Sequence, residues 1–115
     1  MRPGQLTPNA LELAILLKIA AIQPDANLDA PNLHVLSREY TGVGSFTNFS
    51  SRNAREDPPR SILNLPGVIT VAGVQNGLGA HLVLRGGIPE CLEIYTFGSD
   101  HWDGTYETFS LAADV

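Results

Sequence analysis

The feature that most constrains this chain is the segment 80–97, AHLVLRGGIPECLEIYTF, in which two strand-like runs flank Gly86-Gly87. Adjacent glycines between β-forming runs predict a β-hairpin, because glycine adopts the left-handed backbone that tight turns require. Strand side chains alternate between two faces, and a slip of one residue exchanges those faces. The positions of the aliphatic residues therefore select the register.

Two loop lengths are possible for this hairpin. A two-residue loop pairs Arg85 with Ile88 and divides the aliphatic residues of the two strands between the faces. A three-residue loop that includes Ile88 pairs Arg85 with Pro89 and gathers four aliphatic side chains on one face: Leu82, Leu84, Leu92 and Ile94. We predict the three-residue loop, which makes His81 and Glu93 direct neighbours across the hairpin. Since Pro89 has no N–H to donate, its strand should begin at an edge or a bulge.

Length and composition indicate one ordinary globular domain. A chain of 115 residues with 43% hydrophobic residues can bury a core, so we expect residues 1–115 to form a single domain. One cysteine excludes an internal disulfide and a multi-cysteine zinc motif. The start, MRPGQLTPNA, lacks signal-peptide features, and the apolar part of the first helix is about half of the ~20 residues that span a bilayer. We therefore expect a soluble, cytoplasmic protein that does not contact a membrane.

Charged residues are unevenly distributed along the chain. Residues 1–85 contain seven basic and six acidic residues, for a formal charge of +1, whereas residues 86–115 contain six acids and no base, for −6. Nucleic acid is a poor partner for this C-terminal segment, because affinity for phosphate comes from clustered lysine and arginine. A basic protein surface or a divalent cation matches the charge better, and a solvated acidic surface is the alternative. The low charged content of 17% also favours an apolar surface that a partner or a second copy covers.

The first element is predicted to be a helix over 10–22. Thr7 is the expected cap, and Pro8 suits the first helical position because its missing N–H would be unpaired there. Glu12 and Lys18 are the only charged residues in the helix, and aliphatic residues surround most of its circumference. A helix of this kind is buried on more than one side. We expect one side to cover a sheet and the other to meet a loop or a second subunit.

The rest of the chain has the pattern of an antiparallel sheet. LHVLSREY at 33–40 and TGVGSFTNF at 41–49 are expected to be antiparallel strands, with Thr41-Gly42 near the turn. A further strand at 65–74 is apolar on both faces, and TYETFSL at 105–111 is the expected last strand. A turn-rich stretch precedes the first of these strands, at 24–31.

One long loop interrupts the strands, SSRNAREDPPRS at 50–61. Long loops are often functional. The three arginines of this loop could bind a carboxylate or a phosphate, or they could keep the loop in solvent, and we favour the second role. One helix followed by five or six strands with short connections indicates an α+β fold, in which the N-terminal helix packs on a curved antiparallel sheet or partial barrel.

The most reactive-looking cluster is Asp100, His101 and Asp103 in the polar loop GSDHWDG. Carboxylates and imidazole are ligands for divalent metals. Their spacing matches no strict metal motif, and aspartate and glycine are also typical of turns, so we predict no metal site.

No catalytic motif is recognisable in the sequence. Cys91 is expected to be a structural thiol, because the neighbouring Glu90 and Glu93 raise its pKa. The His81–Glu93 pair fits either an oriented general base or a cross-strand ion pair, and we favour the ion pair. We therefore predict no catalytic residue and no cofactor.

Aromatic residues are concentrated beside the acids of the C-terminal segment. Aromatic side chains inside an acidic rim are typical of a protein-binding patch, although two adjacent strands would also bring them into a core. Phe97 and Phe109 are expected in the core, whereas Trp102, in the middle of a loop, is expected to be an exposed anchor. The predicted binding residues are Glu93, Tyr95, Asp100, His101, Trp102 and Asp103.

Two segments, REYTGVGSFTNF at 38–49 and LEIYTFG at 92–98 followed by Trp102, together resemble a pattern in small bacterial proteins that have no assigned activity. The matching residues are those of strands and turns. The resemblance implies a bacterial origin and carries over no catalytic role.

These observations predict a small non-enzymatic domain that acts through protein–protein contact, with formation of a homo-oligomer included. One specific form is an acidic inhibitor or immunity-like protein that masks a basic partner. The alternative is a small ligand-binding barrel or enzyme whose pocket is gated by the 50–61 loop. A deep cavity with His81 or His34 and a carboxylate at its wall would favour this alternative.

Overall fold

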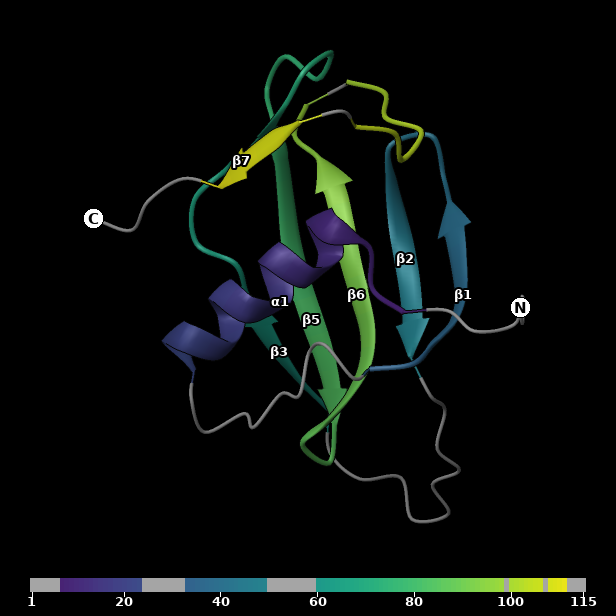
Figure 1. Cartoon of the computed structure of the whole chain (residues 1–115), viewed down its shortest axis with the longest axis vertical. Helices are drawn as coiled ribbons and strands as arrows, with labels where there is room; N and C mark the ends of the chain where they lie inside the picture. Colours follow the sequence, from purple (N-terminus) through teal and green to yellow (C-terminus); the bar gives the residue numbers. More distant parts are fainter. Residues whose placement is uncertain (1–6, 24–32, 50–59, 99, 107, 112–115) are drawn as a thin grey trace.

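Figure 1 shows a computed structural model of the chain, which describes residues 7–23, 33–49, 60–98, 100–106 and 108–111. Within these residues, one helix lies across one face of a seven-stranded antiparallel sheet that is not closed. The predicted α+β fold is confirmed, with an open sheet and with more strands than the five or six expected. The predicted turn-rich stretch 24–31 and residues 50–59 of the predicted long loop lie outside the described residues.

The predicted hairpin forms the middle of the sheet. β5 (Leu78–Arg85) and β6 (Ile88–Thr96) pair antiparallel, and His81 lies directly opposite Glu93, as predicted. The aliphatic side chains on the opposite face are all buried: Leu82, Leu84, Leu92 and Ile94. Burial of these side chains therefore selected the register, as the alternation in the sequence indicated.

The turn of this hairpin differs from the prediction. Arg85 pairs with Ile88 across a two-residue turn, in which Gly86 and Gly87 have φ of 61° and 82°. Two successive positive φ values are those of the turn type that matches strand twist in two-residue hairpins. Glu90 then has no partner in the ladder and forms a bulge beside the strand's proline. This extra residue restores the predicted register, and the three-residue loop was wrong.

The remaining strands extend the sheet on both sides of the hairpin. β1 (Val35–Tyr40) and β2 (Gly44–Phe49) are antiparallel partners, and β2 also pairs with β6. On the other side of β5, β3 (Arg60–Asn64) and β4 (Ile69–Val71) follow one another along the same edge, and β7 (Phe109–Leu111) pairs with β4.

The bounds of β3, β4 and β7 differ most from the predictions. β3 begins at Arg60, so the last two residues assigned to the long loop belong to a strand. The strand predicted at 65–74 is reduced to β4, because Gly67 and Gly73 take φ of 83° and 92° and turn the chain on either side of it. The strand predicted at 105–111 is reduced to β7.

α1 (Ala10–Ile22) is capped by Asn9 rather than by Thr7. The Asn9 side chain accepts from the Glu12 N–H, and the Glu12 carboxylate accepts from the Asn9 N–H, each at 2.8 Å. This reciprocal arrangement satisfies two N–H groups at the helix start. No helix among the described residues is long and apolar enough to cross a lipid bilayer.

The helix is buried on one side only within the described part of the chain. Its sheet-facing residues include Leu11, Ile15, Leu16 and Ile19, each at most 1% exposed. Leu17, on the other side of the helix, is 49% exposed. The predicted contact of this second side with a loop or a second subunit stays a prediction.

Candidate functional site

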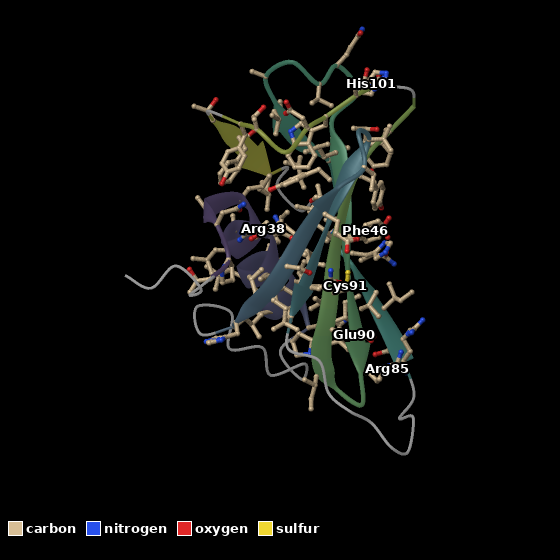
Figure 2. The ribbon with its side chains drawn as sticks, turned by 90° about the vertical axis from the view of Figure 1, so that its right-hand side faces the viewer. Arg38, Phe46, Arg85, Glu90, Cys91 and His101 are labelled. Carbon is tan, nitrogen blue, oxygen red and sulfur yellow. The ribbon has the colours of Figure 1, made fainter. Side chains whose placement is uncertain are left out.

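The two faces of the sheet carry different side chains (Figure 2). Arg38 lies on the side of α1, whereas Phe46 and Cys91 lie on the opposite side. The strand registers place one set of side chains on that opposite side, which we call the outer face: Phe46, Ile62, His81, Val83, Cys91, Glu93 and Tyr95. The helix therefore leaves the outer face uncovered.

A row of rings crosses the outer face. The His81 and Tyr95 rings lie 5.6 Å apart, and Tyr95 meets Phe97 edge-to-face at 5.7 Å. Gly79 lies opposite Tyr95, and a Cβ at this position would come within 2.8 Å of both the Tyr95 and Phe97 rings. The two aromatic rings thus occupy the space that the glycine leaves above β5.

Carboxylates surround the middle of the outer face. The Glu93 Oε1 lies 2.8 Å from the His81 Nε2, so the predicted pair is in contact. Burial raises the pKa of the Cys91 thiol to about 11, and the nearby Glu93, Glu90 and Glu39 add to the shift. Cys91 is therefore a neutral thiol at physiological pH, and it lacks the lowered pKa of a nucleophilic cysteine.

At the hairpin end, Glu90 lies between two arginines. Its Oε2 accepts a hydrogen bond from the Arg85 Nε at 3.2 Å, and its Oε1 lies 3.8 Å from the Arg60 Nε. Arg60 was expected in the long loop, and the structure places it in β3 directly opposite Arg85. One carboxylate between two guanidinium groups keeps these like charges in the same corner of the sheet.

The predicted loop residues lie at the other end of the sheet. The Asp100 carboxylate accepts from the Asn76 N–H at 2.8 Å. Asp103 accepts from the Thr105 hydroxyl and N–H at 2.7 and 3.1 Å, and these bonds lower the pKa of its carboxyl. Both carboxylates are thus engaged with the turns around them, as is typical of aspartate.

Trp102 belongs to the core rather than to the surface. It is 6% exposed, its indole N–H donates to the Thr105 carbonyl at 2.8 Å, and its backbone N–H donates to the Gly42 carbonyl at 2.9 Å. The bond to Gly42 joins the loop to the β1–β2 turn. Phe97, which we expected in the core, is 37% exposed. The expected roles of these two aromatic residues are therefore interchanged.

A depression of about 380 Å³ contains part of the predicted loop site. Its lining consists of Gly42, Ala72, Gly73, Val74, His101, Trp102, Asp103 and Thr105. Glu93 and Tyr95 do not line it, so the structure divides the six predicted binding residues between the outer face and this end of the sheet. Within the described residues, no group of three or more histidine, cysteine or acidic residues could hold a metal ion.

The sequence analysis missed a buried polar network on the α1 side. The Arg38 Nε and Nη2 donate to the two oxygens of Glu12 at 2.8 and 2.7 Å, and the Thr47 hydroxyl donates to the same carboxylate at 2.7 Å. The Glu12 side chain is 3% exposed. The spacing of Asn9 and Glu12 is that of a capping box and was the available signal, but it does not reveal the partner on β1.

No family model, no curated protein and no solved structure matches this chain. The resemblance to small bacterial proteins therefore stays a prediction, and the site is assigned from its geometry.

Proposed function

We propose that this protein is a non-enzymatic interaction domain that binds a protein partner through the outer face. The observation that carries the proposal is the row of rings on the side of the sheet opposite α1, together with the Glu93 carboxylate that pairs with the His81 ring. Aromatic residues surrounded by polar groups are typical of protein interfaces, where the rings supply contact area at a low entropic cost.

The chemistry of the face favours a partner with basic groups around an apolar centre. Phe97 and Ile62 are 37% and 53% exposed, and both are available to lose water on contact. Glu93 is 31% exposed in its side chain and pairs with His81, so an arginine of a partner can compete for the same carboxylate. The specific function that fits this chemistry is that of an acidic inhibitor or immunity-like protein that masks a basic surface.

The depression at the other end of the sheet supports a small-molecule site less well. The carboxylate of Asp103 and the indole N–H of Trp102 are both bonded to Thr105. Small-molecule sites use a few convergent polar groups to orient the ligand. Here those groups are already engaged within their own loop. Arg60 and Ser61 are the part of the predicted gating loop that the structure describes. They begin β3, at the hairpin end of the sheet, whereas the depression lies at the other end.

The test is capture of partners from the native lysate by matched variants. We expect a stoichiometric basic protein that elutes at high salt, and we expect Phe97→Ser and Glu93→Lys to lose it. Leu17→Ser is the control, because it removes a comparably exposed apolar side chain from the helix side. Asp103→Lys reports whether the loop end of the sheet also makes contact.

Two results would contradict the proposal. One is a partner that Phe97→Ser and Glu93→Lys retain as fully as the native protein does. The other is recovery of the protein alone, which would direct attention to the depression and to a screen of small ligands.

A further inference from the structure

The outer edge of β3 presents backbone groups to which no other described strand bonds. β3 pairs with β5, and the Leu65 N–H donates to the Ala80 carbonyl at 2.9 Å in continuation of that register. Antiparallel neighbours alternate between bonded and non-bonded pairs. Ser61 and Leu63 therefore direct their backbone groups to β5, and the N–H and C=O groups of Arg60, Ile62 and Asn64 point away from it. No described strand pairs with this edge.

The opposite edge of the sheet is protected in a way that β3 is not. The register of β1 shifts between Val35 and Ser37, and the bulge interrupts the regular spacing of backbone groups at that edge. Arg38 in β1 is also held by α1 and by the Thr7 carbonyl. β3, in contrast, keeps one register from Arg60 to Asn64. Bulges and charges are the features by which edge strands avoid pairing.

The helix extends beyond the sheet at the same edge. Ile22 lies one helical repeat of eleven residues after Leu11, on the sheet-facing side, yet it is 39% exposed whereas Leu11 is 1% exposed. In Figure 1 the last turn of α1 reaches past β3. A strand added at β3 would lie beneath this turn and cover the apolar side chain that the sheet leaves open.

We propose that a second copy of this chain supplies that strand, by antiparallel pairing of β3 with β3 about a twofold axis at Ile62. With this register Ile62 faces Ile62 of the second copy, and Arg60 faces Asn64 of the second copy. Every outward N–H and C=O of the strand then has a partner, and no like charges are opposed. A twofold interface requires this self-complementarity of one surface with itself. The result is one continuous sheet through both copies, with the outer face of each still available.

The first test removes the donor at the centre of the interface. Ile62→Pro deletes an N–H that points away from β5, so the bonds within the chain are kept, and proline is tolerated at such edge positions. In sedimentation velocity from micromolar to millimolar concentration, the native protein should approach twice its chain mass of 12.3 kDa. Ile62→Pro should stay at the mass of one chain, and Ile62→Val, which keeps the donor, should behave as the native protein does.

The second test checks the register and does not depend on proline. Ile62→Lys and Ile62→Glu each place like charges opposite one another at the axis, so each variant alone should be a monomer. An equimolar mixture should restore the dimer, because the two introduced charges are then opposite in sign. Ile62 is 53% exposed, so neither change disturbs the core.

The proposal is overturned if the native protein is a monomer throughout the range, or if Ile62→Pro and Ile62→Lys leave its dimer unchanged. Monomeric single variants whose mixture fails to dimerise would overturn the register centred on Ile62. Glu93→Lys, which tests the outer face, should leave the dimer mass unchanged, so that failure of one proposal is distinguished from failure of the other.

Discussion

The buried pair between Glu12 and Arg38 is the contact that we expect to matter most for holding α1 on the sheet. The Glu12 carboxylate receives four hydrogen bonds: two from Arg38, one from the Thr47 hydroxyl and one from the Asn9 N–H. Its side chain is 3% exposed and that of Arg38 is 18% exposed. Removal of one partner of a fully buried pair leaves an uncompensated charge, which typically costs about 3–5 kcal/mol.

The structure predicts different losses in the free energy of unfolding for the two single variants. Arg38→Met leaves the carboxylate buried with only the Thr47 and Asn9 donors, and we expect a loss of about 3 kcal/mol in the free energy of unfolding. Glu12→Gln leaves a guanidinium that is partly hydrated and still reaches the Thr7 carbonyl at 2.8 Å, so we expect about 2 kcal/mol. The double variant removes both charges and should lie within about 1 kcal/mol of the native protein.

The same pair predicts a dependence on pH. Burial alone would raise the pKa of Glu12, but the hydrogen bonds from Arg38, Thr47 and Asn9 outweigh it and hold the pKa below its usual value. A lowered folded-state pKa gives stability that is present above the unfolded-state pKa and is lost as the pH falls through the folded-state value. Glu12→Gln should therefore remove this part of the acid-induced loss of stability.

These free energies of unfolding are measured by urea unfolding, followed by the fluorescence of Trp102, at neutral and at acidic pH. The four proteins compared are the native protein, the two single variants and the double variant. A double variant whose loss equals the sum of the two single losses would refute the pairing, and so would single losses below about 0.5 kcal/mol.

Three further predictions follow from single residues. Gly44→Ala should lower the free energy of unfolding more than Gly79→Ala, because a Cβ at position 44 meets the backbone of β6 whereas one at 79 meets aromatic rings that can shift. In urea unfolding we expect losses of roughly 3 and 1 kcal/mol, and equal losses would contradict this. Cys91, whose pKa burial and neighbouring glutamates raise to about 11 from 9.0, should react with a thiol reagent about 100-fold more slowly than an exposed cysteine, and Glu93→Gln should speed it; a native rate equal to that of the unfolded chain would contradict this. Trp102, the single tryptophan, should emit at short wavelength in the native protein and shift to longer wavelength on unfolding, whereas emission already typical of water would contradict its burial.

Local patterns determined those parts of the structure that depend on neighbours along the chain. The alternation of aliphatic residues in 80–97 determined which side of the hairpin faces the core, and therefore the His81–Glu93 contact. The paired glycines determined where the chain reverses, because they accept positive φ without strain. Two β-forming runs with Thr41-Gly42 near the turn predicted the antiparallel pairing of β1 with β2. For these elements the period of the side chains is sufficient information.

Only the tertiary structure decided features that join distant segments. Glu12 and Arg38 lie 26 residues apart, and no local pattern shows that a capping carboxylate also receives a guanidinium from a strand. Trp102 is buried because its loop bonds to the β1–β2 turn, although its polar neighbours in the sequence indicated exposure. β3 is an edge strand because β5 is its one partner among the described strands. Side-chain alternation reports which face a residue occupies, whereas the strand order, which depends on long-range packing, decides what that face or edge meets.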